Sequence, residues 1–170
     1  MIRVSRRTLA ATIVLGLSLV PTTLLAQNAD IESMVEQIFM NRPDEPFVSV
    51  VVRDAAQWEY LAFHISTYLD VKELRVYIIP FKSTDAEAID AALAAGEHEV
   101  AFQQLIAEMR LDLGARYVSD AGLNGVNDQP VALGSGSLRD NFHREQFGTY
   151  EAADKAYRTW LERAVALVES

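Results

Sequence analysis

Two kinds of hydrophobic pattern alternate along the chain and predict its secondary structure. Residues 30–40 carry apolar side chains at helical spacing and predict a short helix. Mostly apolar, β-branched runs at 47–52 and 74–81 predict two strands that are buried on both faces. Between them, Asp54 is a suitable helix N-cap, and the stripe within residues 55–69 predicts a helix. This order predicts a right-handed βαβ unit with parallel strands.

The second half of the chain predicts more helices, one β-hairpin and a long C-terminal helix. Periodic apolar residues predict the helices, and Pro130 with the glycines and serines after it predicts the hairpin. The expected elements are helices from the cap at 83–85 to Gly96, at 99–113 and at 115–123, strands at 131–133 and 138–143 around a turn at 134–137, and a helix at 150–168.

The N-terminus has the layout of a secretory signal peptide. Arg3, Arg6 and Arg7 precede an apolar stretch over 9–20 that is too short to span a bilayer, and a cleavage point follows at Ala26. The arginine pair also fits a twin-arginine signal, but we favour the general secretory route. A periplasmic or secreted location is therefore expected. The expected organisation is a signal peptide over 1–26, a helix and linker over 27–46, and a domain over 47–170 with a helical insertion at about 84–123.

Charge and cysteine content narrow the possible functions. The sequence has 15 basic and 24 acidic residues; removal of residues 1–26 takes away three arginines and leaves 12 basic residues against 24 acidic ones. A net charge of −12 disfavours nucleic acid and anionic lipid as partners. No second apolar run is long enough for stable membrane insertion after signal removal. The chain has no cysteine, so its stability cannot depend on disulfides.

The order of the expected elements resembles the thioredoxin fold, and more narrowly the exported disulfide oxidoreductases and isomerases of the DsbA and DsbC type. Ala62-Phe63-His64 matches a tripeptide often found in that family after its Cys-x-x-Cys motif. The segment 125–131 is similar to the family's Gly-Val-x-Gly-Thr-Pro loop, although Asp128 and Gln129 replace small residues. The resemblance covers about residues 47–168. It implies a mixed central sheet flanked by helices, in a thioredoxin-like βαβ–(helical insertion)–ββα plan of the α/β class.

The resemblance places Gln57 and Tyr60 at the two cysteine positions. Disulfide exchange needs a thiolate, which neither an amide nor a phenol provides. The leading hypothesis is therefore an exported, redox-inactive protein that binds proteins or peptides, or acts like a chaperone, and is not an enzyme. It needs no cofactor or metal, and a monomer is favoured. The groove implied by the resemblance is lined by Gln57, Trp58, Glu59, Tyr60, Gln129 and Pro130, with strand addition at residue 129.

Alternatives remain open at this point. Trp58 belongs either to the edge of the groove or to the buried stripe of its helix. A second hypothesis is a structural accessory of an envelope assembly or conjugative secretion system, and a third is an enzyme with non-thiol chemistry that uses Glu59 and His64. The Glu97-His98-Glu99 sequence is not expected to bind a metal, because neighbouring residues on a helix point in different directions. The sequence from His143 to Glu145 is expected to be an exposed polar loop.

Overall fold

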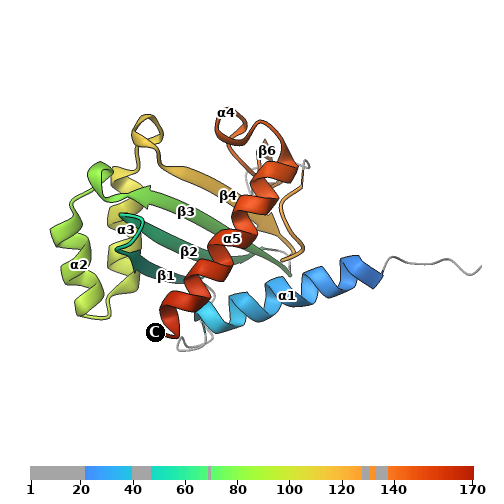
Figure 1. Cartoon of the computed structure of the whole chain (residues 1–170), viewed down its shortest axis with the longest axis horizontal. Coiled ribbons are helices and arrows are strands. Elements are labelled where there is room, and N and C mark those ends of the chain that lie inside the picture. Colours follow the sequence, from blue (N-terminus) through green and yellow to red (C-terminus); the bar gives the residue numbers. More distant parts are fainter. Residues whose placement is uncertain (1–21, 40–46, 69, 128–130, 133–137) are drawn as a thin grey trace, which may run out of the picture.

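A four-stranded antiparallel sheet forms the centre of the molecule (Figure 1). The computed structural model describes residues 22–39, 47–68, 70–127, 131–132 and 138–170. The strands follow one another in space in chain order, so the sheet is a meander, and each strand pairs antiparallel with the next. They are β1 (Phe47–Asp54), β2 (Glu59–Tyr68), β3 (Val71–Pro80) and β4 (Arg116–Ala121).

Helices cover both faces of this sheet. The N-terminal helix α1 (Thr22–Phe39) packs beside the C-terminal helix α5 (Tyr150–Val168), and both lie across one face (Figure 1). The hairpin of α2 (Ala86–Ala94) and α3 (His98–Glu108) covers the opposite face near β1. The remaining elements are short: η1 (Phe81–Ser83), η2 (Leu111–Leu113), β5 (Val131–Ala132), β6 (Leu138–Arg139) and α4 (Arg144–Phe147).

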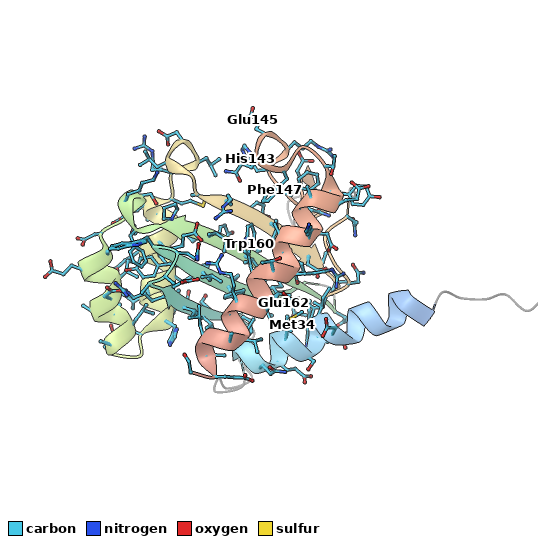
Figure 2. The ribbon with its side chains drawn as sticks, in the orientation of Figure 1. Met34, His143, Glu145, Phe147, Trp160 and Glu162 are labelled. Atoms are coloured by element: carbon cyan, nitrogen blue, oxygen red, sulfur yellow. The ribbon has the colours of Figure 1, made fainter. Side chains whose placement is uncertain are left out.

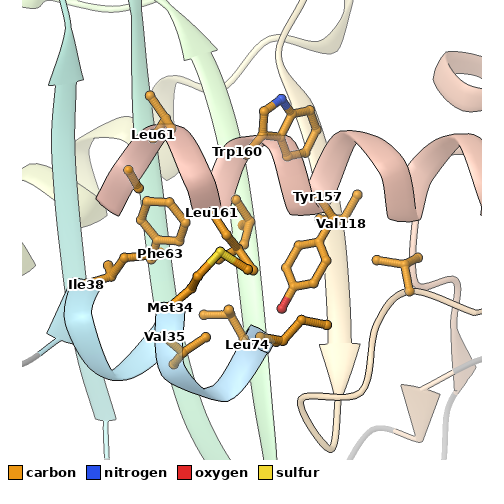
Figure 3. Close-up of a cluster of buried hydrophobic side chains, with 14 of the residues drawn as sticks. Met34, Val35, Ile38, Leu61, Phe63, Leu74, Val118, Tyr157, Trp160 and Leu161 are labelled. Atoms are coloured by element: carbon orange, nitrogen blue, oxygen red, sulfur yellow. The ribbon is translucent and has the colours of Figure 1, made fainter. Parts of the chain in front are cut away.

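The alternation of side chains along the strands creates two hydrophobic cores, one on each face. The larger core lies between the sheet and the α1–α5 pair, where Phe63 of β2 packs near Met34 and Leu161 (Figure 3). The smaller core lies under α2 and α3 and includes Val51, Phe102 and Leu105. Because both faces of β2 are buried, its sequence lacks the alternation of apolar and polar residues that marks a strand with one wet face.

Several predicted elements are confirmed. Residues 30–39 of the helix expected at 30–40 lie within α1, residue 40 lies outside the described residues, and α5 has the bounds expected from its one-sided stripe. The runs at 47–52 and 74–81 are β1 and most of β3. Helices also occur near 85–95 and 99–108, and β5 pairs antiparallel with β6 as expected for the hairpin. The predicted cleavage point at Ala26 falls inside α1, before all of its described buried side chains.

The helix predicted at 55–69 is wrong. Residues 59–68 form β2, which pairs antiparallel with both β1 and β3. Asp54 caps a turn rather than a helix, because its carboxylate accepts the backbone N–H of Gln57 at 3.1 Å. The segment carries Tyr, Phe, Ile and Thr, which favour a strand, and the helical stripe arose because both strand faces are apolar.

The helix predicted at 115–123 is also wrong, since residues 116–121 form β4. These two corrections replace the predicted parallel βαβ unit by an antiparallel meander. The molecule combines strands and helices, as expected for the α/β class in its general sense. The described sheet does not follow the thioredoxin-like strand order.

Candidate functional site

The turn between β1 and β2 is held in place by two arginines on other elements. Asp54, which is almost fully buried, accepts hydrogen bonds from Arg163 of α5 at 2.7 and 3.1 Å. Glu59 at the start of β2 lies 3.2 Å from the same guanidinium and 2.6 Å from Arg116 of β4. Arg116 in turn lies over the ring of Trp160 at 5.4 Å. This network fixes both ends of the turn to the body of the molecule.

Trp58 projects from this turn into solvent. Its side chain is 71% exposed, the highest value among the exposed large hydrophobic side chains of the described residues. Its φ of 56° lies in the left-handed region, which a residue with a Cβ rarely adopts. Its carbonyl oxygen accepts the N–H of Phe81 at 2.9 Å, and the two rings meet edge to face at 6.0 Å.

Phe81 connects Trp58 to a polar cluster at the edge of α2. The guanidinium of Arg53 lies 4.8 Å from the centroid of the Phe81 ring, and its Nε is 3.0 Å from the Asp90 carboxylate. Tyr60 donates to Asp90 at 2.8 Å. Burial, followed by the hydrogen bond to Asp90, raises the pKa of the Tyr60 phenol above its ordinary range. We call Gln57, Trp58, Phe81 and Arg53 the Trp58 surface.

The four described residues of the predicted groove do not line one groove. Gln57 and Trp58 are exposed on the turn, which resolves the alternative for Trp58 in favour of exposure. Glu59 and Tyr60 are neighbours on β2, so their side chains lie on opposite faces of the sheet. Glu59 meets Arg163 of α5 on one face, and Tyr60 meets Asp90 of α2 on the other. Gln129 and Pro130 lie outside the described residues.

The pairing of Glu59 with His64 is wrong for the same geometric reason. The two residues are five positions apart on β2 and face opposite sides of the sheet. His64 instead lies 2.9 Å from the Oγ of Ser49, its direct partner across the β1–β2 pair. Burial lowers the pKa of the His64 imidazole, and the charge of Arg75 on β3 lowers it further.

A row of polar side chains crosses the sheet at this level. Ser49, His64, Arg75 and Ser119 are successive partners from β1 to β4, and all face the side of α2 and α3. Glu73 pairs with Arg75 at 3.0 Å and accepts from Ser119. The arrangement therefore places the His64 imidazole, whose neutral form is favoured, beside the Ser49 hydroxyl. The neighbouring Arg75 is neutralised by its ion pair with Glu73. The sequence pattern does not indicate this row, because Ser49 meets His64 only through the antiparallel register, and the apolar stripe within residues 55–69 predicts a helix.

Of the other two histidines, His98 has a structural partner, whereas the buried Nδ1 of His143 has no hydrogen-bond partner among the described residues. His98 begins α3, and its Nδ1 accepts the backbone N–H of Val51 at 3.1 Å. The exposed polar loop predicted at 143–145 is confirmed only in part: Arg144 and Glu145 are exposed, but they begin the short helix α4, and His143 before it is half-buried (Figure 2). Within the residues that the structure describes, no group of three or more histidine or acidic residues could hold a metal ion.

A buried carboxylate fixes the loop that follows β4. Asp120 accepts the backbone N–H groups of Asn124 and Gly125 and the phenol of Tyr157, each at 2.9 Å. Burial raises the pKa of the Asp120 carboxyl. Burial, followed by the charge of Asp120, raises the pKa of the Tyr157 phenol well above its ordinary range. The cluster connects this loop to α5 and is structural in character.

Comparisons with known proteins identify no relative. The described helices include none that is both long and apolar enough to cross a membrane. No protein-family model matches the chain, and neither a curated protein nor a solved structure matches it. The functional proposal therefore rests on the geometry of the described residues.

Proposed function

We propose that this chain is an exported, redox-inactive protein-binding module that contacts its partner through the Trp58 surface. One observation carries the proposal: a tryptophan that is 71% exposed is held in a left-handed backbone conformation. For a residue with a Cβ this conformation costs roughly 1–2 kcal/mol. Because the side chain is mostly exposed, burial of its apolar surface offsets little of this conformational free energy. A binding role accounts for a position that does not favour folding.

The anchoring of the turn supports the same role. Tryptophan and arginine are the residues most enriched among those that dominate the binding energy of protein interfaces, and the Trp58 surface contains both. The contacts of Asp54 and Glu59 with Arg163 hold the turn before any partner arrives. A preorganised contact surface loses less conformational entropy on binding than a mobile one.

The chemistry of the partner follows from charge and composition. A net charge of −12 after removal of residues 1–26 favours a protein with a basic or neutral rim over nucleic acid or an anionic membrane. The chain has no cysteine, so the contact involves no thiol exchange. Thioredoxin-like membership does not enter the proposal, since the sheet is an antiparallel meander.

Site-specific photocrosslinking in cells provides the test. A photoreactive amino acid at position 57 should form a covalent adduct with one protein, whereas the same amino acid at Tyr150, also exposed, should not. The crosslinked protein is then identified, purified and titrated with the chain by calorimetry. Trp58→Gly should weaken binding at least about tenfold, because truncation of such an interface residue typically costs 2 kcal/mol or more.

The same variant separates binding from folding. Glycine accepts the left-handed conformation at no steric cost, so we expect the free energy of unfolding of Trp58→Gly to stay within about 1 kcal/mol of the parent value. Trp58→Val keeps the strain without the ring and should be the less stable of the two. Equal affinity of the parent chain and Trp58→Gly for the crosslinked protein would refute the proposal.

The assembly accessory and the non-thiol enzyme stay alternative predictions. The identity of the crosslinked protein separates the first from a chaperone-like role, because an accessory should join a component of an envelope assembly. No described contact favours the enzyme, since Glu59 and His64 lie on opposite faces of β2.

A further inference from the structure

Two of the three histidines of the chain lie where α3 packs on the sheet. His98 begins α3 and accepts the N–H of Val51 on β1. His64 on β2 stacks on the Phe102 ring of α3, with centroids 5.1 Å apart and an interplanar angle of 16°. Its Nδ1 also lies 2.9 Å from Ser49, two residues before Val51 on β1. The two imidazoles therefore bridge α3 and the first two strands.

The contact of His98 requires an unprotonated ring nitrogen. A backbone N–H can only donate, so the Nδ1 that receives it must carry a lone pair. Protonation of Nδ1 would set one donor against another and leave the Val51 N–H without this acceptor. The cost of an unsatisfied buried donor is comparable to that of a lost hydrogen bond.

The surroundings of His64 also favour the neutral imidazole. Arg75 of β3 lies directly across from His64 in the sheet, and its charge and the burial of the ring together disfavour protonation. Glu73 of β3 and Glu99 of α3 act in the opposite direction. Glu97, the N-cap of α3, and Glu99 in its first turn flank His98 in the sequence. Arg53 of β1 is paired with Asp90 of α2.

We propose that His64 and His98 form an acid-sensitive latch, which holds α3 on the sheet at neutral pH and releases it when both imidazoles are protonated. The inference goes beyond the proposed function and does not depend on the Trp58 surface. Release of α3 would uncover the outer edge of β1, where the N–H of Val51 points away from β2 and is bonded by His98 instead of a further strand.

The expected pH dependence follows from linkage. An imidazole that is neutral in the closed state and titrates near pH 6.5 in the open state shifts the opening equilibrium about tenfold between pH 7.5 and 5.5. Two such imidazoles shift it about 100-fold. Opening is therefore suppressed above about pH 6.5 and grows as the pH falls below it.

Amide hydrogen exchange of the intact chain, followed by NMR, measures this opening at single residues. After correction for the intrinsic exchange rate, the protection of the Val51 amide should fall about 100-fold between pH 7.5 and 5.5. The Val76 amide, in the buried strand β3, should keep its protection, because its exchange reports on opening of the sheet itself. A parallel loss at Val51 and Val76 would mean global unfolding and would overturn the latch.

Histidine variants give the second arm of the test. Glutamine offers an acceptor oxygen but does not titrate, so His98→Gln and His64→Gln should each reduce the change at Val51 to about tenfold. The double variant should show almost no change, and His143→Gln, which removes the third histidine, should behave as the parent chain. A double variant that still loses about 100-fold of its protection would overturn the proposal.

If the double variant fails to fold, the imidazole ¹⁵N signals of the parent chain provide an independent measurement. Both rings should remain neutral in the closed state at pH 6. A protonated His98 ring in that state would also overturn the latch.

Discussion

Asp120 illustrates how a single buried charge can organise a loop. Its side chain has no exposed surface, and its carboxylate accepts two backbone N–H groups and one phenol. A buried carboxylate is costly unless such donors surround it. Here they connect the residues after β4 to Tyr157 of α5, while Leu123 and Val126 of the same loop pack into the larger core.

We predict that Asp120→Asn lowers the free energy of unfolding by about 1–3 kcal/mol. The neutral amide has one acceptor oxygen, and its NH₂ group would face donors that the carboxylate now satisfies. Urea unfolding followed by circular dichroism measures the change. Asp112→Asn serves as the control, because Asp112 is exposed and pairs only with exposed Arg110, and its unfolding midpoint should not move. Equal midpoints for both variants would contradict the role of Asp120.

The candidate site could be predicted from the sequence only in part. The sequence singled out residues 57–60, and two of them, Gln57 and Trp58, are exposed at the proposed surface. The contribution of Phe81 could not be foreseen, because it depends on the pairing of β2 with β3. The same holds for Ser49 beside His64. Contacts set by register become visible only when both strands have been recognised.

At the scale of elements, the difference between α5 and β2 shows why one was predicted and the other was not. The helix α5 has one buried side and one exposed side, and Thr149 caps it through a hydrogen bond to the N–H of Ala152. Its pattern therefore has a single period. β2 is covered on both faces, so its apolar residues satisfy a helical and a strand period together.

The attachment of α5 to the β1–β2 turn gives a prediction at this scale. Arg163→Met should lower the free energy of unfolding by about 1–3 kcal/mol, because it leaves the buried Asp54 carboxylate without its cation. The double variant Asp54→Asn/Arg163→Met should lose less free energy of unfolding than the sum of the losses in the two single variants. Lys155→Met, the same kind of change at an exposed position of α5, is the control and should be nearly neutral. Additive effects at 54 and 163 would argue against the ion pair.

At the scale of the whole molecule, the two ends of the described chain stabilise the same core. α1 and α5 pack side by side on the sheet, and Ile31, Met34 and Val35 contribute to the cluster that Leu161 and Trp160 complete (Figure 3). The general class of the molecule was predictable from its mixture of helical and strand-like segments. The order of the strands was not, because one misassigned segment turned an antiparallel hairpin into a parallel unit.

Two buried phenols should make the whole molecule sensitive to alkali. The pKa values of Tyr60 and Tyr157 are raised in the folded state, so folding favours their neutral forms. Their stabilising contribution is complete below the unfolded pKa of about 10 and is lost as the pH rises toward the folded values. Each phenol should reduce the free energy of unfolding by up to about 1.4 kcal/mol per pH unit in that window.

Urea unfolding between pH 9 and 11 tests this prediction. Tyr60→Phe and Tyr157→Phe should each remove part of the slope, whereas Tyr150→Phe, which changes an exposed ring, should not. The phenolate absorbance of Tyr60 and Tyr157 should appear together with unfolding. A slope that persists in the Tyr60→Phe/Tyr157→Phe chain would show that other groups cause the alkaline loss.

The positions of the only two tryptophans have a practical consequence. Trp58 is 71% exposed, whereas Trp160 is 3% exposed and lies against Phe147 (Figure 2). An aqueous quencher such as iodide should therefore reach one indole and not the other. The quenchable fluorescence of Trp58 should report on binding of a partner at the turn, and the protected fluorescence of Trp160 should report on whether the core is folded. One unlabelled sample therefore measures both binding and folding.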